Sequence, residues 1–162
     1  MKSIQSFKTP FLTLFILFMT ACESNSTSEP EIPEPPFEAV NISFEGVDVQ
    51  LNDTSFTVDG FTFRSESAQT TPSNFDNQGV DLTPGLIELE LEGIIGISQI
   101  TISMFNNSDP TISLLNNGEL VRETNDDLEG GVINAVIDVE GLTFDALRIF
   151  SFEATILSIT LE

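Results

Sequence analysis

Histidine, the side chain that most often serves as a catalytic base or a transition-metal ligand, does not occur in this sequence. The sequence also has no Trp and no Tyr, and Cys22 is its only cysteine. No lysine follows Lys8, so a serine nucleophile beyond that point would have neither an imidazole nor an amine to act as its base. One thiol can form neither an internal disulfide nor a cysteine zinc site. We therefore predict that the protein is not an enzyme.

Carboxylates are the one reactive group in abundance, with 26 Asp and Glu residues. Two of them could form a glycosidase pair, but among so many acids suitable separations arise by chance, so this stays the least favoured alternative. Carboxylate oxygens also suit calcium, and they concentrate in two stretches, residues 74–81 and 123–131. The candidate ligands of a structural calcium are Asp76, Asp81, Asp126 and Asp127. Neither stretch has EF-hand spacing, and a solvated loop is the alternative.

The strong negative charge limits the choice of partner. The formal net charge is −21, and the only basic residues after Cys22 are Arg64, Arg122 and Arg148. Such a chain repels phosphate backbones, so we expect no nucleic-acid partner. The same sign disfavours direct adhesion to anionic lipid. The simplest role of the acidity is to keep an extracytoplasmic protein soluble.

Sugar binding requires aromatic faces together with a few fixed polar groups. Four phenylalanines lie at alternating positions typical of a core: Phe44, Phe56, Phe61 and Phe63. Phe75 instead lies in a polar stretch, and Phe105 ends an alternating run just before two asparagines. The predicted ligand contacts are therefore Phe75 and Phe105, with Arg64 and Arg122 as polar partners.

The N-terminus has the pattern of a secretory signal. Lys2 and Lys8 precede the apolar run FLTLFILFM at residues 11–19, which is shorter than the roughly 20 residues of a membrane-spanning helix. The run ends in Met-Thr-Ala-Cys, which resembles the bacterial lipobox. The resemblance implies that residues 1–21 are removed and that the thiol of Cys22 receives lipid. A buried helix with a core cysteine is the alternative, but the sequence after Cys22 cannot continue a helix.

Residues 22–36 read as a lipidated cysteine followed by an acidic, proline-rich tether. The stretch ESNSTSEPEIPEPP contains four Pro and four Glu, and such a segment favours polyproline II over a packed core. At about 3.1 Å per residue it could span roughly 40 Å. Together these features are similar to those of envelope lipoproteins of Bacteroidetes-like bacteria. That resemblance implies an outer-membrane lipoprotein, with the cell surface preferred over the periplasmic face.

From Phe37 onward the hydrophobic pattern changes to period two, which predicts β-strands. Alternating runs cover residues 39–44, 47–51, 55–63, 87–91, 99–105, 111–121, 132–139, 147–152 and 155–161. The pairs Asp59-Gly60 and Asn117-Gly118 interrupt two of them, and each pair predicts a hairpin turn. Nine or ten strands in residues 37–162 predict a single all-β sandwich. Spacing alone does not choose between immunoglobulin-like and jelly-roll topologies.

Two segments resemble galactose-binding-like jelly rolls: GLIELELEGIIGISQITISMFNNS at residues 85–108 and GLTFDALRIFSFEATILSITLE at residues 141–162. The resemblance implies the jelly-roll topology and a structural calcium of the kind these domains often carry. The function we expect is a lipoprotein that displays a non-catalytic binding or adhesion module for a glycan or a protein. The alternative is a structural accessory subunit of an outer-membrane complex.

The lipid anchor is directly testable. We expect the chain to incorporate a radioactive fatty acid when it is expressed in its bacterial host, because the Cys22 thiol is the attachment point. The variant Cys22→Ala should take up none, and labelling that survives in this variant would contradict the prediction.

Overall fold

The alternating runs form ten antiparallel β-strands in the computed structural model, which describes residues 37–71, 78–124 and 130–162. The strands are β1 (Val40–Ser43), β2 (Ser55–Val58), β3 (Phe61–Thr70), β4 (Val80–Glu90), β5 (Gln99–Asn106), β6 (Thr111–Asn116), β7 (Glu119–Thr124), β8 (Gly131–Asp138), β9 (Ala146–Ser151) and β10 (Ala154–Leu161). All of these described elements are strands, so the all-β prediction is confirmed. In these three ranges no helix is both long and apolar enough to cross a membrane.

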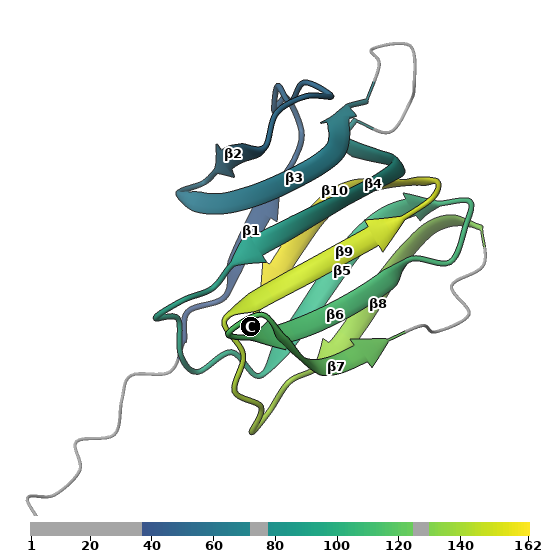
Figure 1. The fold of residues 1–162 in the computed structure, drawn as a ribbon. Coiled ribbons are helices and arrows are strands. Elements are labelled where there is room, and N and C mark those ends of the chain that lie inside the picture. Colours follow the sequence, from purple (N-terminus) through teal and green to yellow (C-terminus); the bar gives the residue numbers. More distant parts are fainter. Residues whose placement is uncertain (1–36, 72–77, 125–129) are drawn as a thin grey trace, which may run out of the picture. The chain divides into compact units, whose positions relative to one another are not determined.

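The strands form two layers of one continuous sheet (Figure 1). The first, called here the six-strand layer, has the order β2-β3-β4-β9-β6-β7. The second, called the four-strand layer, has the order β1-β10-β5-β8. Each layer turns one face to the other and one face outward, which is the arrangement of a β-sandwich. The predicted sandwich is therefore present.

Strand β4 joins the two layers by changing its partner along its length. Its first part, Val80–Leu82, pairs with β10 of the four-strand layer, and Gly85–Glu90 pairs with β9 of the six-strand layer. Pro84 lies between these two pairings. Because proline has no backbone N–H, it is tolerated where a ladder is interrupted, and here it marks the corner of the sandwich.

Both predicted hairpins are confirmed by the backbone. Asp59 and Gly60 have φ values of 51° and 86°, and Asn117 and Gly118 have values of 52° and 79°. Positive φ at both central residues is the type I′ conformation, whose twist matches that of the flanking strands. These turns connect β2 to β3 and β6 to β7.

The prediction of a strand at residues 47–51 is wrong. Val49 is buried as the alternation indicated, but this segment forms no regular ladder. Instead the Thr70 hydroxyl donates to the Val47 carbonyl at 2.7 Å and accepts from the Val49 N–H at 2.6 Å. The Thr70 N–H also donates to the Val49 carbonyl at 2.8 Å. One residue of β3 thus holds this segment through its backbone and its hydroxyl, without a regular ladder.

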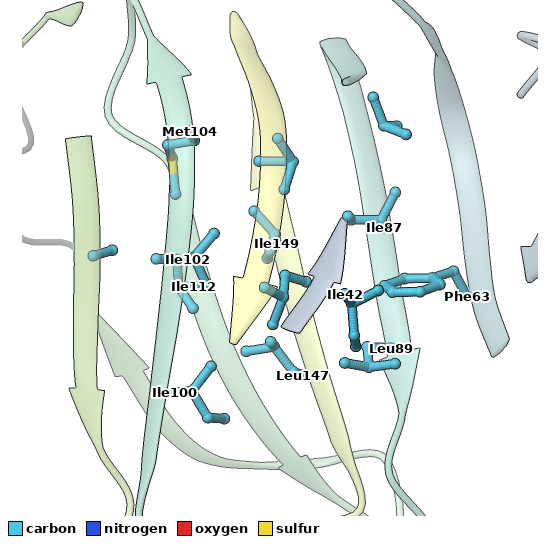
Figure 2. Close-up of a cluster of buried hydrophobic side chains, with 14 of the residues drawn as sticks. Ile42, Phe63, Ile87, Leu89, Ile100, Ile102, Met104, Ile112, Leu147 and Ile149 are labelled. Carbon is cyan, nitrogen blue, oxygen red and sulfur yellow. The ribbon is translucent and has the colours of Figure 1, made fainter. Parts of the chain in front are cut away.

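The core fills the space between the layers (Figure 2). The four-strand layer contributes Ile42, Ile100 and Ile102, and the six-strand layer contributes Ile87 and Leu147 from the facing side; all are 0–1% exposed. At one end three phenylalanines meet: the Phe63 ring lies 5.2 Å from that of Phe44 and stacks at 5.0 Å on that of Phe56. Phe44 and Phe63 are fully buried, whereas Phe56 and Phe61 are partly buried against the core.

Removal of Phe63 should therefore be costly. We expect Phe63→Ala to lower the free energy of unfolding of the unit Pro35–Glu162 by about 3–5 kcal/mol, because it leaves a cavity in a dense core. Urea denaturation measures the change. The matched control is Phe152→Ala, whose side chain is 64% exposed and whose loss should cost less than about 0.5 kcal/mol. Equal effects of the two substitutions would contradict this description of the core.

Candidate functional site

The outer face of the six-strand layer carries the densest group of polar and aromatic side chains that could hold a ligand. Strand β9 shows how the sequence builds it: Leu147 and Ile149 are buried in the core, so Arg148 and Phe150 point to the opposite face. The same alternation on β4 buries Ile87 and turns Glu88 outward.

A ladder of charged side chains crosses this face. The register places Arg64 of β3 opposite Glu88 of β4, and Glu88 opposite Arg148 of β9. Arg148 Nε donates to Glu88 Oε2 at 2.8 Å, and Arg148 Nη2 lies 2.6 Å from the same oxygen in an ion pair. Arg64 Nη1 lies 3.8 Å from Glu88 Oε1, and Arg64 Nε donates to Glu90 Oε1 at 2.8 Å. The two guanidinium groups are therefore held by two carboxylates from one strand.

These four groups differ in their access to solvent. The Glu88 side chain is 12% exposed, whereas those of Arg148 and Arg64 are 40% and 67% exposed. Glu88 is thus the most buried of the four side chains, and the arginines retain N–H groups that face outward. Exposed ion pairs contribute little to stability, so we assign the ladder a geometric role: it fixes the direction of the two planar donors.

Two phenylalanine rings lie beside the ladder. Phe150, opposite Leu86 on β4, meets Phe152 edge-to-face with ring centroids 5.1 Å apart. Phe152 follows β9 in the turn to β10 and is 64% exposed, which makes it the most exposed large apolar side chain among the described residues. Exposed aromatic rings that flank fixed polar groups are typical of a ligand contact rather than of packing.

The rings border a hollow of about 390 Å³, and the backbone accounts for its shape. Ser67 of β3 has a φ of 56° and lies at a bulge where the pairing of β3 with β4 shifts. A Cβ atom on Gly85 would lie 2.6 Å from the Ser67 carbonyl oxygen, so only glycine permits this approach. Bulges of this kind often occur next to binding sites. The lining residues are Glu66, Ser67, Pro84, Gly85, Leu86, Phe150 and Phe152.

A second hollow of about 300 Å³ lies on the other side of the ladder. It is polar and combines Arg64, Glu88 and Glu90 with the β6–β7 turn and with Asp145, which precedes β9. The Asp145 carboxylate accepts the Asn117 N–H at 2.7 Å and so holds the turn against this hollow. The ladder is thus bordered by an apolar recess on one side and a polar one on the other.

The ligand contacts predicted from the sequence do not come together. Arg64 belongs to the ladder. Phe105 lies on the outer face of the four-strand layer, opposite Thr155, where it lines a separate hollow of about 230 Å³. Arg122, on edge strand β7, donates from Nη1 to the Asp138 carbonyl at 2.6 Å. Phe75 lies outside the described residues.

The calcium prediction falls largely outside the described residues, because Asp76, Asp126 and Asp127 are not among them. The remaining candidate, Asp81 of β4, accepts a hydrogen bond from the Thr83 hydroxyl at 2.9 Å. Within residues 37–71, 78–124 and 130–162, no three or more His, Cys, Asp or Glu side chains are grouped to hold a metal ion.

Sequence reasoning missed Glu88, Arg148, Phe150 and Phe152. The segment LRIFSF predicts a strand that is apolar on both faces in places, and its aromatic residues are not among the predicted ligand contacts. The sequence nevertheless contained a usable signal. Arg148, Phe150 and Phe152 occupy alternate positions and so lie on one face of the predicted strand, whereas Leu147 and Ile149 lie on the other. What the sequence could not supply was the register that places Glu88 beside Arg148.

Comparison with known proteins supports the topology. No family model and no curated protein sequence matches this chain. Among solved structures it is similar to two alanine variants of CBM29-2, a family 29 carbohydrate-binding module. One has a TM-score of 0.52 at 12% identity, and the other 0.50 at 14% identity; each comparison covers 78% of this chain and 92% of that chain. The likeness shows the fold alone, and the predicted β-sandwich with jelly-roll topology is confirmed.

Proposed function

We propose that the protein is a membrane-anchored lipoprotein whose β-sandwich binds a glycan, without catalysis, on the outer face of the six-strand layer. The observation that carries this proposal is the placement of the exposed Phe152 and its neighbour Phe150 beside guanidinium groups fixed by Glu88. Sugars present apolar ring faces and a rim of hydroxyl groups, and this face offers a partner to each.

The phenylalanine rings and the polar side chains would contact different parts of a sugar. A phenylalanine ring can cover the C–H face of a sugar but cannot bond its hydroxyls, so polar contacts must come from elsewhere. The outward N–H groups of Arg64 and Arg148 can donate to hydroxyl oxygens, and the Glu66 carboxylate can accept from hydroxyl groups near the rings. The face therefore supplies both halves of sugar recognition.

The fold supports the same proposal. The two similar structures are described as carbohydrate-binding modules used to probe ligand recognition. Non-catalytic binding requires no His, and the absence of Tyr and Trp leaves phenylalanine as the one aromatic side chain that could cover a sugar ring. We extend glycan binding to this chain on the strength of its own aromatic and polar groups, because a shared fold alone does not determine function.

The remaining parts of the proposal come from the sequence. Lipid on Cys22 would anchor the protein in the outer membrane, and residues 23–36 would hold the sandwich away from the bilayer. Two or three acyl chains give durable anchoring at about 0.8 kcal/mol per buried CH₂ group. Display at the cell surface would give the module access to external polysaccharide. Calcium remains a candidate structural ion.

One observation favours the alternative of an accessory subunit in an outer-membrane complex. The edge strands β7 and β8 each pair with a single neighbour among the described strands, and each carries exposed apolar residues. Leu120 and Val121 on β7 are 59% and 40% exposed, and Val132 and Val136 on β8 are 62% and 55% exposed. Arg122 of β7 donates to the Asp138 carbonyl of β8, so these two edges are in contact. We prefer the glycan hypothesis because the outer face of the six-strand layer combines exposed rings with fixed polar groups.

Glycan binding can be tested with the unit Pro35–Glu162 on an array of soluble glycans. We expect binding that Phe152→Ala weakens by about tenfold, since one aromatic contact is worth about 1.4 kcal/mol. The matched control is Phe105→Ala, which removes the same ring from the outer face of the other layer and should leave the affinity unchanged. Loss of binding in Phe105→Ala but not in Phe152→Ala would contradict the proposed site, and absence of binding to any glycan would contradict the function.

A further inference from the structure

We infer that Glu88 determines specificity at this face: it holds Arg148 in position and cancels its charge, and so restricts the face to uncharged glycans. This inference rests on the proposed function. It concerns which class of glycan is accepted, and it comes from the distribution of charge around the ladder rather than from the aromatic pair.

The charges of the ladder cancel within a small area. Only three arginines follow Cys22, and two of them, Arg64 and Arg148, lie here. Each contacts a carboxylate at 2.8 Å or less, Arg148 through Glu88 and Arg64 through Glu90. Two positive and two negative groups sum to zero, whereas the chain as a whole carries −21. The centre of the face is therefore a neutral island on an acidic surface.

The surroundings of this island exclude anions. Glu66 lines the apolar hollow on one side, and Glu92 and Asp145 line the polar hollow on the other. A uronic acid or sulfated sugar would meet these carboxylates, and it would find guanidinium groups whose charge is already satisfied. Like charges brought together cost binding energy, while a neutral sugar meets no such penalty.

Glu88 also fixes the orientation of Arg148, in addition to cancelling its charge. Its Oε2 atom accepts a hydrogen bond from Arg148 Nε and lies 2.6 Å from Arg148 Nη2 in an ion pair, and its side chain is nearly buried between two strands. The guanidinium plane of Arg148 is thereby fixed, and its outward N–H groups keep one direction. Glu88→Gln keeps the shape of the side chain but removes the charge, so it should both loosen Arg148 and leave the ladder with one excess positive charge.

Affinity gel electrophoresis of protein purified from the full-length chain tests this inference. Hydroxyethyl cellulose and galactomannan serve as neutral probes, and carboxymethyl cellulose serves as the anionic probe. We expect a neutral probe, and not carboxymethyl cellulose, to retard the wild type. Glu88→Gln should bind the neutral probe about tenfold more weakly, as expected for a lost charge-assisted hydrogen bond. Because the bordering carboxylates of Glu66, Glu92 and Asp145 are unchanged, the variant should gain only weak retardation by carboxymethyl cellulose, through the Arg148 guanidinium that has lost its ion pair. A salt concentration of 0.5 M should abolish that gain because exposed charges are screened.

Two control variants separate local from global charge. Glu45→Gln removes an equal charge from an exposed turn after β1 and should behave as the wild type. The double variant Glu88→Gln, Arg148→Gln restores the zero sum and should again ignore carboxymethyl cellulose. The inference is overturned if the wild type binds carboxymethyl cellulose as well as the neutral probes, or if Glu88→Gln matches Glu45→Gln. A wild type that binds neither neutral probe contradicts the proposed function instead.

A measurement without ligand keeps the positioning role testable in either case. We expect the Arg148 Nε–Hε group to give a sharp NMR signal with slow hydrogen exchange in the wild type, and a broadened, fast-exchanging signal in Glu88→Gln. Unchanged exchange would show that Glu88 does not position Arg148.

Discussion

The structure depends on the division of β4 between two partners. Through Val80–Leu82 this strand belongs to the four-strand layer, and through Gly85–Glu90 it belongs to the six-strand layer. Without that change no backbone hydrogen bonds between strands would join the two layers, and packing alone would hold their apolar faces together. The constraint is local: Pro84 interrupts the ladder, and Gly85 accepts the close approach of Ser67 that no larger residue would permit.

The candidate site is a consequence of the same corner. The bulge at Ser67 and the turn of β4 open the apolar hollow, and they leave Leu86 and Phe150 accessible at its base. Further along β4 the backbone pairing is regular again, and there Glu88 lies opposite Arg148. Irregular backbone thus creates the space, and regular backbone fixes the polar groups beside it. A partly buried ion pair of this kind adds little stability, so its value lies in orientation.

The sequence was sufficient for the fold because most of its information is local. Alternation identified the strands, and the pairs Asp59-Gly60 and Asn117-Gly118 identified two hairpins through the φ values they require. The strand predicted at residues 47–51 was wrong because this segment bonds to the hydroxyl and the backbone N–H of one distant residue, Thr70, and forms no regular ladder. The long strand β4 was only partly predicted, since Pro84 and Gly85 break the alternation that its second half displays.

The site was less accessible to sequence reasoning, because a binding face depends on register across strands distant in the chain. Arg64 was predicted as a ligand contact and lies in the ladder, but Phe105 and Arg122 lie elsewhere. Phe150 and Phe152 were not among the predicted contacts, because they lie in a run that is apolar on both faces in places. Composition still restricted which side chains could contact a sugar: with no Trp or Tyr in the chain, any aromatic contact must come from phenylalanine.

The central claim is that a glycan binds the outer face of the six-strand layer. The most direct measurement is an NMR titration of the unit Pro35–Glu162 with a soluble glycan that it binds on the array, followed through the backbone amide signals. We predict that the signals of Arg64, Glu88, Arg148 and Phe152 shift and that those of Thr101 and Ser103, on the opposite layer, do not. Shifts confined to Thr101 and Ser103 would contradict this account.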